Sequence, residues 1–167
     1  EQTSQITYSL WFNHNYVNLP LNASQGTMWF KGGSWKESAI KLNSNGTVGF
    51  YFREGTPNAA AYVITSKTAI NADTWNHLCV VVKQNTSGSQ IELFLNGQSN
   101  EVITYPNNSN FNWLTTINTP CAGQGIRIGK EINGCGVNSG FNGKLDDLAI
   151  WNRALTQQEV TSLYVGQ

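Results

Sequence analysis

Apolar and polar residues alternate along several short segments of the chain, and this period predicts β-strands. The alternation is present in residues 8–12, 48–53 and 91–95. Because successive side chains of a strand point to opposite faces of a sheet, we expect each segment to be a half-buried strand. A continuous apolar run over residues 78–82 predicts a central strand of a sheet.

Asn-Gly pairs mark two turns among these apolar segments. Asn45-Gly46 and Asn96-Gly97 each separate one apolar segment from the next. Both pairs are typical of tight hairpins, whose central residues need positive φ. Many short strands with turn signals between them, and one helical segment at the end, predict an all-β fold. We expect a two-sheet antiparallel β-sandwich with a short C-terminal helix.

The last part of the chain carries the start signals of that helix. Thr156 is a good N-cap, and Glu159 lies at the third helical position, where it closes a capping box. Leu155 can pack on Val160 as a hydrophobic staple. The face that docks the helix is expected to carry two further side chains, Leu163 and Tyr164.

An acidic pair interrupts the apolar pattern just before the helix. Asp146 and Asp147 lie within residues 145–150, where Leu145, Leu148 and Ile150 are apolar. We expect a half-buried strand with one irregular step at the acidic pair.

Four motifs occur in the order typical of one known domain family: residues 75–81, 91–97, 126–129 and 141–160. The last resembles the closing segment of laminin G-like domains of the concanavalin A-like lectin/glucanase superfamily. The others resemble that family's Trp-x-His strand, its following hairpin strand and its hydrophobic-x-Ile-Gly strand. The resemblance spans nearly the whole chain and implies a jelly roll, in a family that binds more often than it catalyses.

The domain organisation follows from length and from this resemblance. A chain of 167 residues is expected to be one domain, residues 1–167, a laminin G-like jelly-roll module of a larger extracellular protein. The segment 6–12 resembles what is usually the family's second strand. We therefore expect the preceding edge strand to be absent or to come from a neighbouring region.

Charge and composition exclude two classes of partner. Ten basic and ten acidic residues give no net charge, and the basic residues are scattered along the chain. Nucleic acid and anionic membrane are therefore not expected partners, and no apolar run approaches the ~20 residues that cross a bilayer. Only 12% of the residues are charged and six are Trp. This composition is typical of extracellular β-proteins and predicts a secreted or cell-surface location.

The three cysteines favour an oxidising compartment. Cys121 and Cys135 flank a glycine-rich stretch, and a disulfide between them would contribute about 3 kcal/mol by chain entropy. Cys79 lies in the apolar run and is expected to be a buried free thiol. Three reduced cysteines are the alternative. Zinc is disfavoured, because His14 and His77 have no ligand-like spacing to the cysteines.

Glucanases share this fold, so the spacing of the acidic residues indicates whether the chain could catalyse the same reaction. Retaining glucanases resemble one another in a Glu-x-Asp-x-x-Glu strand, which places nucleophile and acid/base about 5 Å apart. No two acidic residues of this chain lie two or four positions apart. We therefore expect a protein that is not an enzyme and has no catalytic residues. A catalytic pair assembled from distant strands is the alternative.

Sugar binding requires aromatic side chains on an exposed face, because the apolar face of a sugar ring stacks on them. If Leu10, Phe12, Phe50 and Phe52 point into the core, alternation puts the residues between and beside them on the opposite face. The candidate ligand-binding residues lie on that face, near it or in loop-like segments: Trp11, Tyr51, Arg53, Tyr62, Trp35 and Trp113. For each of them, covering the outer sheet or packing under a loop is the alternative role.

Calcium is the cofactor that the family resemblance implies, because such domains often carry a rim site of carboxylate and carbonyl oxygens. Asp146 matches the acidic position of the closing motif, and Asp147 lies beside it. The alternative role for Asp146 is to bind backbone donors where the strand bends. By the same resemblance, Trp75 and His77 are expected within a strand, packed and hydrogen-bonded.

The expected function is that of a non-catalytic carbohydrate-binding, lectin-like module of a secreted or cell-surface protein. Its partner would be a glycan or cell-surface polysaccharide, and the Trp and Tyr content favours this reading. The alternative is a protein-binding or structural spacer domain of a large adhesin, with surface proteins as partners.

Overall fold

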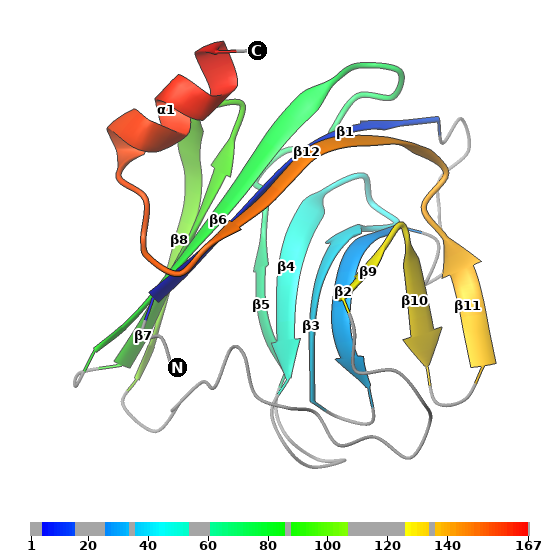
Figure 1. Ribbon diagram of the computed structural model, residues 1–167, viewed down its shortest axis with the longest axis horizontal. Coiled ribbons are helices and arrows are strands. Elements are labelled where there is room, and N and C mark those ends of the chain that lie inside the picture. Colours follow the sequence, from blue (N-terminus) through cyan, green and yellow to red (C-terminus); the bar gives the residue numbers. More distant parts are fainter. Residues whose placement is uncertain are drawn as a thin grey trace. The chain divides into compact units, whose positions relative to one another are not determined.

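The computed structural model describes residues 5–15, 26–33, 36–53, 61–85, 88–106, 126–133 and 136–166. These residues form strands β1 to β12 and the C-terminal helix α1 (Figure 1). They fall into two compact units, each of which contains one antiparallel five-stranded sheet. The architecture is the predicted all-β class with a short terminal helix, and it is consistent with a jelly-roll sandwich.

Unit 1 comprises Glu1–Asn13, Thr74–Thr115 and Lys144–Gln167. Its sheet has the order β12-β1-β6-β7-β8, and Figure 1 shows β12 (orange) running along β1 (blue). The elements of the unit are β1 (Gln5–His14), β6 (Asn76–Asn85), β7 (Gly88–Leu95), β8 (Gln98–Pro106), β12 (Gly143–Trp151) and α1 (Gln157–Val165). The first strand of the chain therefore pairs with its last strand.

Alternation along β1 separates the two faces of this sheet. On one face, Tyr8 and Leu10 are buried, opposite Val80 and Leu78 of β6. On the other face, a second core forms around residues of β6, β7 and the C-terminal segment: Cys79, Val81, Phe94, Leu155 and Val160. The helix side of the sheet is thus apolar as well, and β6 is buried on both sides.

Helix α1 begins with the predicted capping box. The Thr156 hydroxyl accepts a hydrogen bond from the backbone N–H of Glu159 at 3.2 Å, and Oε2 of Glu159 accepts one from the backbone N–H of Thr156 at 2.8 Å. Leu155 and Val160 meet in the second core, as the hydrophobic staple predicts. Buried Thr7 of β1 fixes the approach to the helix, because its hydroxyl donates to the carbonyl oxygen of Arg153 and accepts from the N–H of Leu155.

The Asn96-Gly97 turn anchors the helix to the sheet. Both residues have positive φ, 50° and 76°, as the predicted hairpin requires. The carbonyl oxygen of Gly97 accepts hydrogen bonds from Gln157 Nε2 at 2.7 Å and from Thr161 Oγ1 at 3.0 Å. A Cβ atom at Gly97 would lie 2.9 Å from the ring of Tyr164, so only glycine allows this approach.

Three aromatic rings pack together where α1 contacts β1 and β6: Trp11, His77 and Tyr164. Trp11 of β1 stacks on Tyr164 of α1 with centroids 5.6 Å apart, and His77 of β6 lies 5.2 Å from Trp11. His77 is buried, and its Nε2 is hydrogen-bonded to the Ser9 hydroxyl at 2.8 Å. Burial lowers the pKa of His77 from 6.5 to about 4, so the imidazole is neutral at pH 7.

Unit 2 comprises His14–Asp73 and Thr116–Gly143. Its main sheet has the order β5-β4-β3-β2-β9, and β10 and β11 form a separate two-stranded sheet. Trp29, Ile40, Phe50 and Ile64 share one row across the sheet and are buried. The strands are β2 (Thr27–Gly33), β3 (Lys36–Leu42), β4 (Val48–Arg53), β5 (Ala61–Thr65), β9 (Ile126–Ile128), β10 (Lys130–Asn133) and β11 (Gly136–Gly140).

Two expectations about local structure need correction. The connection between β3 and β4 spans residues 43–47, so it is longer than a tight two-residue turn, and of the pair only Gly46 has positive φ. Asn45 instead caps the loop, because its Oδ1 accepts the backbone N–H of Thr47 at 3.1 Å. Trp75 lies just before β6 rather than within it, and it is 43% exposed rather than packed.

The structure describes only one of the three cysteines. Cys79 is a buried free thiol in β6, as expected. Burial, with a smaller effect from the nearby Glu92 charge, raises its pKa to about 12, so it is unreactive at neutral pH. Cys121 and Cys135 lie outside the described residues, and their disulfide stays a prediction.

The capping box can be tested by removing the Thr156 hydroxyl. Thr156→Ala should lower the free energy of unfolding by about 1 kcal/mol, because the first helical turn loses its side-chain acceptor. Thr156→Ser keeps the hydroxyl and should stay close to the parent protein. The urea midpoints of the three proteins, compared at equal m-values, measure the difference. An equal loss in both variants would mean that the hydroxyl does not stabilise the helix.

The neutral state of His77 predicts a dependence of stability on pH. The folded-state pKa lies below the ordinary value, so between pH 6.5 and 4 the unfolded chain binds more protons than the folded chain. The free energy of unfolding should therefore fall as the pH drops through this window, by up to about 3 kcal/mol. Urea unfolding at intervals from pH 7 to 4 measures the slope. His77→Gln should flatten it, and an unchanged slope would assign the effect to another group.

Candidate functional site

Tyr51 of β4 lies on the face of the unit 2 sheet predicted for it. Phe50 and Phe52 on either side are buried on the opposite face, whereas the Tyr51 side chain is only half-buried. Cross-strand partners share a face, so the strand register assigns its neighbours. We call this surface the Tyr51 face and define it by six residues: Ala39, Lys41, Gly49, Tyr51, Val63 and Thr65.

The Tyr51 ring extends along its own strand toward Gly49. A Cβ atom built at Gly49 would lie 3.4 Å from Cε2 of Tyr51 and 2.7 Å from the carbonyl oxygen of Ile64. The missing side chain therefore leaves room for the ring beside the sheet backbone. The Nζ of Lys41 lies 5.8 Å from the ring centroid, within the range of a cation–π contact.

Hydrogen bonds hold the phenol in this position. The Tyr51 hydroxyl donates to Oδ1 of Asn43, whose Nδ2 donates to the Thr47 hydroxyl at 3.0 Å. That hydroxyl donates in turn to Oδ1 of Asn45 at 2.7 Å. Burial raises the pKa of Tyr51, against a smaller opposing effect of its bond to Asn43, so the phenol is neutral at pH 7. The ring is fixed by a chain of polar groups in the β3–β4 loop.

The other candidate residues of unit 2 are only partly described. Arg53 is the last residue of β4, and Tyr62 lies in β5 opposite Phe52. The register therefore puts Tyr62 in the row of Phe52 rather than in the row of Tyr51. Trp35 and Trp113 lie outside the described residues.

Trp11 belongs to unit 1 and lines a hollow there. On β1 it lies on the opposite face from Leu10 and Phe12, as alternation predicts. The hollow has a volume of about 260 Å³ and is lined by Ser9, Trp11, His77, Asp147, Leu148, Ala149, Trp151 and Leu163. Trp11 and Tyr51 thus have separate surroundings, each within its own unit.

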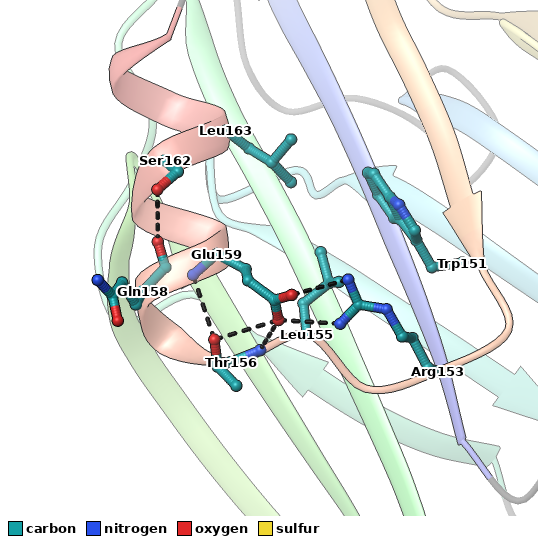
Figure 2. Close-up of a pocket in the computed structure, with 8 residues that line it drawn as sticks. All are labelled: Trp151, Arg153, Leu155, Thr156, Gln158, Glu159, Ser162 and Leu163. Carbon is teal, nitrogen blue, oxygen red and sulfur yellow. Dashed lines mark hydrogen bonds and ion pairs between the residues drawn. The ribbon is translucent and has the colours of Figure 1, made fainter.

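A second hollow of unit 1, of about 400 Å³, shares Trp151 and Leu163 with the first. Figure 2 shows the Arg153 guanidinium facing the Glu159 carboxylate across it. Two contacts join them, at 2.7 and 2.9 Å. The bond to Arg153, then that to the Thr156 backbone, lower the pKa of Glu159 to about 2. Both charges are therefore engaged in holding the start of α1.

Within the described part of the chain, the hydrogen bond between Ser9 and His77 resembles that of a nucleophile with its base. Catalysis needs a base whose pKa lies near the working pH, and the pKa of about 4 makes His77 a weak base at neutral pH. Among the described residues, Nδ1 of His77 has no hydrogen-bond partner, so no carboxylate orients the ring. The pair is suited to packing and hydrogen bonding rather than to acyl transfer.

Asp146 and Asp147 form the irregular step predicted in β12. Asp147 has a positive φ of 46°, and Oδ1 of Asp146 accepts its backbone N–H at 2.9 Å. This contact is the structural role expected at a strand bend. In the described part of the chain, no group of three or more His, Cys, Asp or Glu side chains is arranged to hold a metal ion. Calcium at this pair stays a prediction.

Sequence reasoning missed the residues that position Tyr51. Gly49 lies two positions before the aromatic residue and therefore on the same face, a signal visible in the sequence. The contribution of Asn43 was not visible, because it depends on the conformation of the β3–β4 loop. Trp151 was also missed, because its strand places it beside Trp11 only through the pairing of β12 with β1.

Solved structures of similar fold come from proteins of several kinds. A sialidase CBM40 from Ruminococcus gnavus bound to α2,3-sialyllactose is 15% identical, with 97% of this chain and 83% of that chain covered and a TM-score of 0.73. A heptameric SAP-like pentraxin from Limulus polyphemus is 18% identical, with 97% and 70% covered and a TM-score of 0.60. A mutant NanB sialidase from Streptococcus pneumoniae is 15% identical, with 95% and 24% covered and a TM-score of 0.72.

At these identities the likeness shows the fold alone. No curated protein sequence matches the chain. Among the described residues, no helix is long and apolar enough to span a membrane. Residues 1–161 match the laminin G family described as the concanavalin A-like lectin/glucanases superfamily, which is nearly the whole chain. The chain therefore belongs to the concanavalin A-like lectin/glucanases superfamily.

Proposed function

We propose that the chain is a non-catalytic carbohydrate-binding module of a secreted or cell-surface protein and that it binds glycans on the Tyr51 face. The observation that carries the proposal is the position of Tyr51, whose ring extends toward Gly49 and is held by Asn43. A ring fixed in this way can stack on the apolar face of a sugar without first being ordered. The similar sialidase module from Ruminococcus gnavus adds support for this ligand class.

The charge on the Tyr51 face indicates which glycans to test first. Lys41 is the one charged residue among the six that define the face, and its cation lies over the Tyr51 ring. A sugar that carries a carboxylate could draw this cation off the Tyr51 ring, pair with it, and stack on the ring in its place. The structure of the Ruminococcus gnavus module contains α2,3-sialyllactose. Sialylated glycans are therefore the first ligands that we propose for this face.

The non-catalytic part of the proposal has two supports. The sequence lacks the paired carboxylates of the retaining glucanases. His77 has too low a pKa to activate Ser9 efficiently at neutral pH.

We further propose that residues 1–167 act as one module. By the same register Glu37 and Arg53 continue the Tyr51 face, and one carboxylate is too few for a calcium site, so we expect its binding to be independent of calcium.

A glycan array that includes plant, algal and sialylated host glycans tests the proposal, with calcium and with a chelator. We expect sialylated glycans to bind in both conditions. Silence across the array in both would contradict the proposal and favour the protein-binding or spacer alternative. Loss of binding with the chelator alone would show that calcium takes part.

Substitution of Tyr51 tests the site itself. Tyr51→Ala should weaken binding of 3′-sialyllactose, measured by calorimetry, by roughly three- to tenfold, because the stacking surface is lost. Tyr51→Phe keeps the ring and should bind nearly as the parent protein does. Melting temperatures of both variants control for folding. Equal affinity of the parent protein and the Ala variant would place the glycan elsewhere.

A further inference from the structure

The smaller hollow of unit 1 has the features of a binding site that the proposed function does not use. We call it the Trp151 hollow, and it lies beside α1 between side chains of β1, β6 and β12. It combines two indole rings, a buried imidazole, a hydroxyl and an exposed carboxylate. Aromatic walls with a few polar groups are the usual composition of a small-molecule site.

We infer that the Trp151 hollow binds a single neutral or amino-sugar ring, at a site separate from the Tyr51 face. The ligand class rests on the proposed function, whereas the residues and the charge preference are specific to this hollow. Its volume of about 260 Å³ lies just below the roughly 300–1,000 Å³ of pockets that enclose drug-sized ligands. One pyranose ring matches that size better than an oligosaccharide does.

The two indole rings that line the hollow are held in place by neighbouring side chains. Trp11 stacks on Tyr164 at 5.6 Å and contacts His77, so one side of its ring is supported by other rings. Trp151 packs against the second core of unit 1. Rings that are fixed before the ligand arrives lose little conformational entropy on binding. Their apolar surfaces can take the C–H face of a sugar.

His77 contributes a fixed, neutral ring to the wall of the hollow. Its side chain is buried, and among the described residues its Nδ1 makes no hydrogen bond. The atom is covered from solvent as well, so the imidazole lines the hollow as a neutral ring and not as an open hydrogen-bonding group. Because Nε2 is bonded to the Ser9 hydroxyl, Nδ1 is a donor in one tautomer and an acceptor in the other. The bond to Ser9 holds the ring in place in either tautomer.

Asp147 sets the charge preference of the hollow. It is the only acidic side chain among the eight lining residues, and His77 is neutral at pH 7. Its carboxylate can accept hydrogen bonds from sugar hydroxyls or from an amino group. The same charge would repel an acidic sugar. The Tyr51 face, which carries Lys41, has the opposite preference.

Substitutions at two adjacent residues distinguish a direct role of the Asp147 carboxylate in binding from a general effect of negative charge. Asp147→Asn removes the carboxylate from the hollow, and Asn tolerates the positive φ of this position. Asp146→Asn makes the same charge change next to the hollow and keeps the Oδ1 that accepts the N–H of residue 147. Both side chains are exposed, so both variants should fold.

The probes are methyl β-D-glucopyranoside and D-glucosamine, titrated into ¹⁵N-labelled protein. We expect at least one of them to shift the indole signals of Trp11 and Trp151 and the imidazole signals of His77. Asp147→Asn should weaken that binding about tenfold, whereas Asp146→Asn should leave it nearly unchanged. No shift of these signals with either sugar, or equal weakening by the two variants, would overturn the inference.

A parallel titration with 3′-sialyllactose distinguishes this inference from the proposed function. Shifts at Tyr51 with sialyllactose and none in the hollow with the neutral and amino sugars would leave the proposed function intact and overturn the inference. Shifts in the hollow without any at Tyr51 would support the inference and count against the Tyr51 face. Tyr51→Ala should not change the affinity of the hollow, since the two sites share no residue.

Discussion

The central strand of unit 1 is apolar on both faces, and both faces therefore need a cover. Leu78 and Val80 point to one side of β6 and Cys79 and Val81 to the other, and all four are buried. On the second side, α1 and the segment before it provide Leu155 and Val160. The helix has only nine residues, too few to be stable alone, so its capping box, Thr7 and the Gly97 carbonyl act together to hold it.

This arrangement explains why the hollows of unit 1 lie where they do. A helix crosses only part of a sheet, and the side chains of β1 and β12 next to it remain half covered. At that boundary Trp11 and Trp151 are supported by packed neighbours on one side. In unit 2 the Tyr51 ring lies against the sheet itself, next to Gly49, which has no side chain. Each unit thus presents aromatic rings whose positions are fixed by packing or hydrogen bonds.

The features that sequence predicted are those set by local rules. The capping box at Thr156, the positive φ values at Asn96 and Gly97, and the irregular step at Asp147 each depend on a few neighbouring residues. The family resemblance predicted the fold class. Alternation also put Trp11 and Tyr51 on the correct faces of their strands.

The features that sequence did not predict depend on contacts between distant segments. Trp75 was expected to be packed, but β6 begins one residue later and leaves its side chain exposed. The meeting of Trp11 with Tyr164 joins residues from the two ends of the chain, and nothing in the local pattern of either signals it. The same holds for the hydrogen bond between Ser9 and His77. Side-chain surroundings of this kind are set by register and topology, which periodicity alone does not specify.

The acidic step in β12 has a consequence for solubility. β12 lies at the edge of its sheet, and an edge strand has backbone groups that another chain can pair with. The left-handed backbone at Asp147 breaks the regular spacing of those groups, and two exposed carboxylates stand beside the break. A second strand could not add here without distorting its own backbone and burying both charges. The acidic step is therefore a feature that disfavours edge-to-edge pairing along this part of β12.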